Sequence, residues 1–141
     1  MFFKIRETSE KIRWKKEKEM AIVCGQFLID KGYEVTEEDY AVVFKKEDKS
    51  IRVVFERYDN WVDIFIVFDG DREYYDIGSM AFVIDGISNK PREVMNRIII
   101  VMDYIEKNYD KVTDHSYCIE GNRLVNKYIR NNKDKYGLNI P

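Results

Sequence analysis

The chain has 141 residues, of which 45% are hydrophobic and 35% are charged, and its formal net charge is −2. This length and composition are typical of one globular domain with a substantial core, so we expect a single domain over residues 1–141. Residues 1–19 lack the long apolar core of a signal peptide. No run approaches the roughly 18 apolar residues of a membrane span, so we expect a cytoplasmic protein that does not bind a membrane.

The charge is unevenly distributed along the chain. Residues 1–19 carry seven Lys and Arg against four Asp and Glu, residues 20–89 carry seven against fifteen, and residues 90–141 carry ten against seven. A surface of one sign attracts partners of the other sign. The acidic middle therefore disfavours a nucleic-acid ligand and favours a basic protein partner.

The N-terminal region predicts one long helix over residues 9–31. Thr8 or Ser9 can cap it, and Gly32 supplies a stop. Trp14 stands alone in the charged first half, which we expect to be a solvated helix end. The apolar positions recur at helical spacing and are Ile12, Met20, Val23, Cys24, Phe27 and Leu28.

Short strands should follow at residues 33–36 and 40–46, separated by an acidic turn at 37–39, with Tyr40 on the core face of the second strand. Asp59-Asn60 then predicts a two-residue hairpin loop between residues 51–58 and 61–68, with Glu56 facing Asp63 and Phe55 facing Ile64. Side chains alternate between the faces of a sheet, so this hairpin has a core face and an open face. The expected core side chains are Ile51, Val53, Phe55, Ile64, Ile66 and Phe68, with Tyr75 and Ile77 from the next strand.

The open face should combine carboxylates with aromatic side chains. A second turn at Asp69-Gly70, with a loop of two or four residues, brings Glu56, Asp63 and Asp76 side by side across three strands. Like charges in that position are unfavourable, so we expect a cation from another element, or an arginine of the face, to lie near them. The arginines concerned are Arg52, Arg57 and Arg72, and the surrounding aromatic side chains are Tyr58, Trp61, Phe65 and Tyr74.

After Gly78-Ser79 the apolar run at 80–84 predicts a further short strand. A helix is predicted from Pro91 to about Tyr109, and another over residues 119–131. The predicted fold class is α+β, with an N-terminal helix, an antiparallel meander of four to six strands, and two C-terminal helices on one face of the sheet.

Motifs for nucleotide binding, zinc proteolysis or serine hydrolysis are missing from the sequence. Cys24 and Cys118 are expected to be reduced thiols, and His115 with Cys118 supplies too few ligands for structural zinc. Asp69-Gly70-Asp71 resembles the opening of a calcium loop, but a hairpin turn explains it better. We therefore expect a protein that is not an enzyme and has no cofactor.

Two stretches of the chain resemble a known class of proteins, and they are VVFERYDNWVDIFIVFDG and PREVMNRIIIVMDYIEKNYDK. In the order helix, acidic sheet with exposed aromatics, then helices, it resembles the immunity proteins of bacterial polymorphic toxin and contact-dependent inhibition systems. The resemblance implies a stoichiometric inhibitor that binds a toxin domain, often a nuclease, and blocks it.

We therefore expect the open face to bind a protein, with carboxylates as charge partners and aromatic side chains as anchors. Two other uses of the face stay open, which are a carboxylate-dependent metalloenzyme site and self-association into a homodimer. The predicted partner-binding residues are Glu56, Tyr58, Trp61, Asp63, Tyr74 and Asp76.

Overall fold

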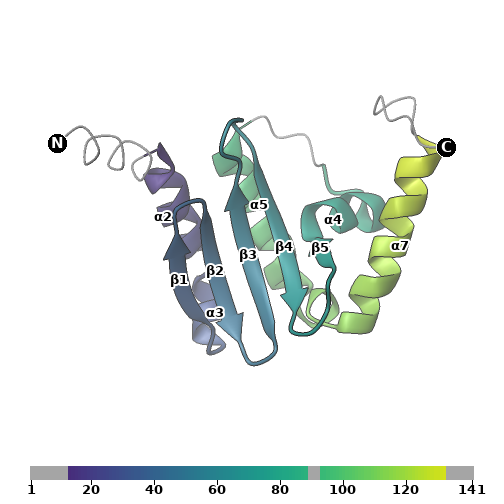
Figure 1. Ribbon diagram of the computed structural model, residues 1–141, viewed down its shortest axis with the longest axis horizontal. Helices are drawn as coiled ribbons and strands as arrows, with labels where there is room; N and C mark the ends of the chain where they lie inside the picture. Colours follow the sequence, from purple (N-terminus) through teal and green to yellow (C-terminus); the bar gives the residue numbers. More distant parts are fainter. Residues whose placement is uncertain (1–12, 89–92, 133–141) are drawn as a thin grey trace.

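A computed structural model describes residues 13–88 and 93–132. It contains one five-stranded antiparallel sheet in the order β1-β2-β3-β4-β5, so the strands form a meander in chain order (Figure 1). The α+β class and the meander are confirmed. The strands are β1 (Glu34–Glu38), β2 (Ala41–Lys46), β3 (Lys49–Phe55), β4 (Val62–Phe68) and β5 (Tyr74–Asp76).

Some of the helices cover one face of the sheet, and the others lie beside the edge formed by its last strands. Helices α2, α3 and α5 lie behind the strands, whereas α4 and α7 lie beside β4 and β5 (Figure 1). The opposite face, turned toward the viewer, has no described helix over it. The helices are α2 (Lys15–Cys24), α3 (Gln26–Asp30), α4 (Ile77–Asp85), α5 (Val94–Lys107), α6 (Tyr109–Val112) and α7 (His115–Asn131).

The core lies between the sheet and these helices and includes the side chains that the strand alternation predicted. Burial of apolar area is the main favourable term in folding, at about 25 cal/mol per Å². The predicted core side chains of the hairpin are all buried, and they are Ile51, Val53, Phe55, Ile64, Ile66 and Phe68.

The N-terminal helix differs from its prediction in two ways. Trp14 is 3% exposed because its ring stacks on Phe55 at 5.1 Å between centroids, so the expectation of a solvated helix end is wrong for Trp14, whereas Lys15 and Lys16 beside it are exposed. The predicted single helix is broken into α2 and α3 at Gly25, where a Cβ would stand 2.3 Å from the Phe44 ring. The predicted caps Thr8 and Ser9 lie outside the described residues.

Residues 80–84 form the middle of helix α4, so the predicted strand there is wrong. The Asp76 carboxylate accepts a hydrogen bond from the Ser79 backbone N–H at 3.0 Å and caps the helix, which ends at Gly86 in the left-handed conformation. A short apolar run surrounded by other elements carries no periodicity that separates a helix from a strand.

The remaining boundaries move by a few residues. β1 continues through the predicted acidic turn to Glu38, so the turn consists of Asp39 and Tyr40, and Tyr40 is not in a strand. The last helix begins at His115, four residues before its prediction, because Asp114 caps it through the N–H groups of Ser116 and Tyr117. Pro91, the predicted start of the preceding helix, lies outside the described residues.

Candidate protein-binding face

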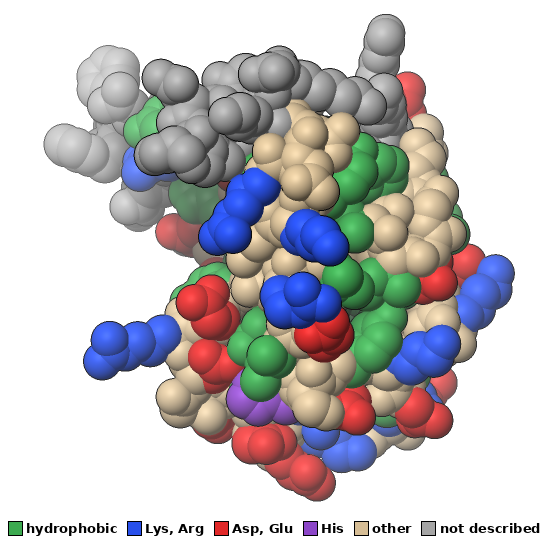
Figure 2. All heavy atoms as spheres, turned by 90° about the vertical axis from the view of Figure 1, so that its right-hand side faces the viewer, with side chains coloured by type: hydrophobic (Ala, Val, Ile, Leu, Met, Phe, Trp, Pro, Cys, Tyr) green, Lys and Arg blue, Asp and Glu red, His purple; other side chains and the backbone are tan. Residues whose placement is uncertain are grey.

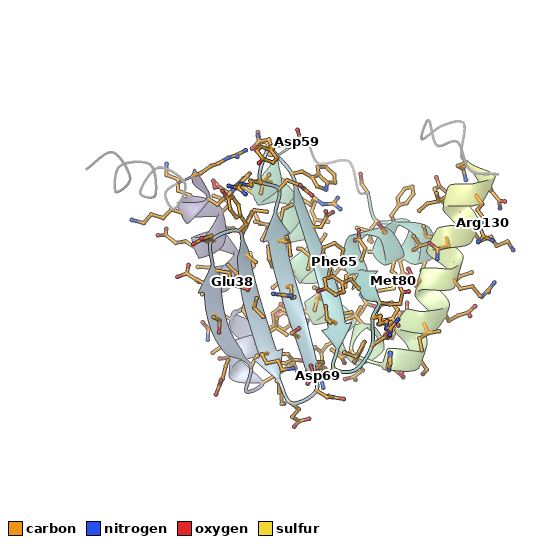
Figure 3. The ribbon with its side chains drawn as sticks, viewed as in Figure 1. Glu38, Asp59, Phe65, Asp69, Met80 and Arg130 are labelled. Atoms are coloured by element: carbon orange, nitrogen blue, oxygen red, sulfur yellow. The ribbon has the colours of Figure 1, made fainter. Side chains whose placement is uncertain are left out.

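The uncovered side of the sheet, here called the open face, has one arginine and several apolar side chains near its centre, with charged side chains around them. Phe65 lies near the middle of the sheet, with Glu38 toward β1 and Asp69 at the lower turn (Figure 3). The strand register places Val43, Arg52 and Phe65 in one row across three strands, and Val54 beside them. The open face consists of Glu34, Thr36, Glu38, Ala41, Val43, Lys45, Ser50, Arg52, Val54, Glu56, Trp61, Asp63, Phe65, Val67, Tyr74 and Asp76.

The β3–β4 hairpin has a four-residue loop, 57–60, instead of the predicted two-residue loop. Phe55 pairs with Val62, and the Glu56 N–H donates to the Trp61 carbonyl at 2.9 Å. The register is shifted by two residues from the prediction. A shift of two keeps each side chain on its predicted face, because side chains alternate with a period of two.

The registers of two strand pairs displace the three carboxylates: the β3–β4 shift moves Glu56 away from Asp63, and the β4–β5 pairing places Asp76 two residues along β4 from Asp63. Asp63 lies opposite Val54, Asp76 lies opposite Phe65, and Glu56 is level with Trp61. The prediction that Glu56, Asp63 and Asp76 lie side by side is therefore wrong. In the described part of the chain, no group of three or more His, Cys, Asp or Glu side chains is placed to hold a metal ion.

A buried arginine of α5 organises the upper end of the open face. Arg97 is 4% exposed, and its Nε donates to the Val62 carbonyl at 2.9 Å. Its guanidinium lies 4.2 Å from the centroid of the Trp61 ring, and the Trp61 Nε1 donates to Asp63 Oδ1 at 2.9 Å. Trp61 is thus held between a cation over its ring and an acceptor for its N–H.

Asp76 has a structural role in this region. Burial raises the pKa of its carboxyl group, and the nearby Asp63 charge raises the pKa further. The hydrogen bonds from Ser79 and the positive charge of Arg97 act in the opposite direction on the pKa. The predicted cation from another element is therefore Arg97, which acts on Asp76.

The arginine could have been found in the sequence. Position 97 lies in the apolar helical stripe that includes Val94, Ile98 and Val101, at the i+3 spacing. A charged residue on a buried stripe requires a partner on the facing element.

Tyr58, Tyr74 and Glu56 are exposed to solvent. Tyr58 is 86% exposed, and Tyr74 is 53% exposed. Tyr74 contacts Phe65 edge-on at 6.0 Å between centroids, whereas Tyr58 belongs to the hairpin loop, with the Arg57 guanidinium 5.6 Å from its ring. Trp61, Asp63 and Asp76 are therefore drawn together around Arg97, whereas Tyr58 and Tyr74 stand apart from that group.

The basic side chains within the open face are held by carboxylates. Arg52 Nη2 donates to both oxygens of Glu38, at 3.0 and 3.1 Å, and Lys45 lies 2.7 Å from Asp69. Arg52 therefore pairs with β1 and not with the predicted carboxylates. With Lys45 and Arg52 so engaged, the remaining carboxylates make the surface acidic.

Comparison with known proteins adds no family to this geometry. No protein-family model matches the chain, and no curated protein or solved structure matches it either. The candidate site therefore rests on the chain's own residues. Among the residues that the structure describes, no helix is both long enough and apolar enough to cross a membrane.

His115 and Cys118 do not form a ligand pair. His115 Nε2 lies 2.7 Å from Asp71 Oδ2, and the ring stacks on Phe68 at 4.3 Å. The Cys118 thiol donates to the Val112 carbonyl at 3.2 Å, and burial raises its pKa to about 12. Cys118 is therefore a buried, protonated core residue.

Proposed function

We propose that this protein is a non-enzymatic inhibitor of the immunity type, which acts in the cytoplasm and docks its open face on a basic protein partner to block it. The observation that carries the proposal is the open face itself. It combines apolar side chains around Arg52, which is paired with Glu38, with aromatic side chains and further carboxylates on a sheet surface that no described helix covers. Exposed apolar surface with a polar rim is typical of protein interfaces.

Trp61 and Tyr74 are the proposed anchors. Large aromatic side chains dominate interface energies, particularly when they are already held in position before binding. Trp61 meets this condition because Arg97 and Asp63 fix its ring. Tyr74 adds a hydroxyl group beside the Phe65 ring.

Charge selects the class of partner. Glu34, Glu56 and Asp63 lie on the open face, and both basic side chains of the face are in ion pairs with carboxylates. Such a surface attracts a basic protein and accelerates its association. A nuclease active site is one surface of that kind, because it must hold phosphates.

The proposal is tested by capturing the partner with matched surface variants. The tagged protein, Phe65→Lys and Ile119→Lys are used to capture proteins from the native host. Phe65 lies at the centre of the open face, whereas Ile119 is an exposed apolar residue of α7. We expect one basic protein to bind the wild-type chain and Ile119→Lys but not Phe65→Lys.

The captured protein is then produced alone and with the inhibitor. When the captured protein is produced alone, we expect it to arrest the growth of the cells that produce it. Co-production of the wild-type chain should restore growth, and co-production of Phe65→Lys should not. Equal capture by all three chains would contradict the open face as the interface. Wild-type dimers that Phe65→Lys abolishes in analytical ultracentrifugation would instead support self-association.

A further inference from the structure

A second feature of the molecule lies outside the open face. A cavity of about 390 Å³ opens between the C-terminal end of α4, Ile87 two residues beyond it, and α5. None of its described lining residues belongs to the sheet, so it is separate from the proposed protein interface. The lining residues are Asp85, Ile87, Ile99, Ile100, Asp103, Tyr104, Lys107 and Asn108.

The walls of this cavity are mainly apolar. Ile87 and Ile100 are half-buried, and Ile99 is 43% exposed at the mouth. Ligand sites of small molecules have volumes of roughly 300–1,000 Å³, mostly apolar walls and a few placed polar groups. The cavity meets each of these conditions.

Among the lining residues that the structure describes, one carboxylate, Asp85, has no opposite charge beside it. Lys107 Nζ lies 2.9 Å from Asp103 Oδ2, so these two charges compensate each other. Asp85 Oδ2 accepts a hydrogen bond from the Tyr104 hydroxyl at 2.5 Å, which orients the carboxylate without neutralising it. A carboxylate can accept further hydrogen bonds, so Asp85 keeps acceptor capacity toward a ligand.

Tyr104 is fixed as a donor in this arrangement. Its burial and its hydrogen bond to Asp85 raise the pKa of the hydroxyl above its usual range, so the group stays protonated. Asn108 is also fixed, because its side-chain amide donates to the Tyr104 carbonyl at 3.0 Å. Asp85 is therefore the lining carboxylate whose charge no described lining residue compensates.

We propose that this cavity binds a small organic ammonium ion, with its apolar body against Ile87, Ile99 and Ile100 and its charged nitrogen at Asp85. The ammonium group donates a hydrogen bond to the carboxylate, and the two opposite charges cancel. An anionic ligand of the same shape would meet the Asp85 charge and be rejected. A neutral ligand would gain the apolar contacts but lose the charge-assisted hydrogen bond.

The test is an NMR titration of the full chain with three probes of similar shape. These are 2-phenylethylammonium, 2-phenylethanol and 3-phenylpropionate. With the ammonium ion we expect saturable shifts of the Ile99, Ile100 and Tyr104 signals. The alcohol should bind at least about tenfold more weakly, and the carboxylate should not bind.

Two substitutions of one carboxylate each provide the matched comparison. Asp85→Asn is expected to weaken binding of the ammonium ion by about tenfold or more. Glu106→Gln removes an exposed charge of α5 that does not line the cavity, and binding should be unchanged. Ile99→Lys places a cation at the mouth, at an exposed position that the fold tolerates, and should abolish binding.

Equal binding of the three probes would overturn the proposal, because it would show an apolar cavity without charge selection. Equal affinity of Asp85→Asn and wild type would also overturn it. Two further results would overturn the proposal. One is saturable shifts confined to the open face, and the other is no saturable binding of the ammonium ion at millimolar concentration.

Discussion

Arg97 is the residue on which the upper end of the open face depends most. It comes from the helical layer, yet it bonds the backbone of β4 and stacks on the Trp61 ring. The β4 backbone at Val62 lies beyond the short β5, which pairs only with residues 65–67 of β4. The guanidinium thus satisfies a buried carbonyl at a sheet edge that lacks a strand.

Arg97→Ala is expected to lower the free energy of unfolding by about 2–3 kcal/mol, because it leaves the Val62 carbonyl without its donor and a partly buried carboxylate without its cation. The pKa of Asp76 should rise further, since Arg97 lowers it in the wild-type protein. Urea unfolding followed by circular dichroism measures the first effect, and NMR titration of the carboxyl carbon measures the second. Arg97→Lys keeps the charge but not the planar group, so it should lose less free energy of unfolding than Arg97→Ala. Equal losses in the two variants would contradict a role for the charge.

A second residue-scale prediction concerns Asp71, which joins the β4–β5 loop to α7. Its carboxylate accepts a hydrogen bond from the Tyr75 hydroxyl at 2.5 Å and lies 2.7 Å from His115 Nε2. The hydrogen bonds from Tyr75, the Glu73 backbone N–H and His115 lower the pKa of Asp71 to about 2, from an ordinary value of 3.8. A lowered pKa in the folded state means that the stabilisation is present above about pH 4 and is lost as the pH falls toward 2.

Asp71→Asn should therefore be less stable than wild type at pH 7, and the difference should narrow as the pH falls from 4 to 2. Urea unfolding at a series of pH values measures this. Asp110→Asn, a change at an exposed residue of α6, is the control. A difference between Asp71→Asn and wild type that is constant across this pH range would show that the Asp71 charge does not contribute.

At the scale of single elements, α4 depends on the last residue of β5. Asp76 ends the strand and caps the helix, and burial raises the pKa of its carboxyl group. With a raised pKa in the folded state, the contribution of this ionisation to stability is most favourable below the ordinary pKa and declines as the pH rises through the raised value. At neutral pH, the cap therefore stabilises the folded state, whereas the burial of the Asp76 charge destabilises it.

Two substitutions separate these effects. Asp76→Asn and Asp76→Ala both remove the charge, but only Asn keeps an acceptor for the Ser79 N–H. Asp76→Ala is expected to be less stable than Asp76→Asn by about 1 kcal/mol, the usual value of an N-cap. Urea unfolding at pH 7 measures the difference, and equal stability of the two variants would rule out the cap.

The β3–β4 hairpin shows which part of the fold could be predicted from the sequence. The alternation in 51–55 and 62–68 defines the two faces, and this assignment survives an error of two residues in the register. The loop length could not be predicted, because Asp59-Asn60 fits more than one turn. The placement of Glu56 against Asp63 depended on that length, and the placement of Asp76 depended on the β4–β5 register, so the alignment of the three carboxylates is the part of the site that was wrong.

Helix α4 shows a second limit. Met80 and Ala81 are buried in a short apolar run, and only the cap by Asp76 distinguishes the helix from a strand. The side chain of Asp76 was assigned to the open face from the strand pattern alone. Contacts between elements, such as those of Arg97 and Asp76, are not contained in a periodicity.

At the scale of the whole molecule, the two sides of the surface differ in charge. The side that includes α7 carries interspersed basic, acidic and apolar side chains (Figure 2). On the open face, the basic side chains are held in ion pairs, and further carboxylates lie around the apolar side chains. A basic partner is therefore attracted more strongly to the open face than to the side that includes α7.

The two tryptophans offer a test of whether the sheet and helices fold as one unit. One contiguous core includes Trp14 at the start of α2 and Val125 in α7, and α2 packs on both α5 and β2. Trp14 stacks on Phe55 of β3, whereas Trp61 contacts Arg97 of α5. The two rings therefore report on different junctions of the same core.

Each single-tryptophan variant, Trp14→Phe and Trp61→Phe, should unfold in urea with one transition. Fluorescence of the remaining tryptophan and far-ultraviolet circular dichroism of that variant should give the same midpoint, because a continuous core cannot lose one junction without exposing the rest. An earlier fluorescence transition in Trp61→Phe would mean that α2 separates from the sheet before the sheet unfolds. The comparison is made within each variant, so any loss of stability caused by the substitution itself does not affect it.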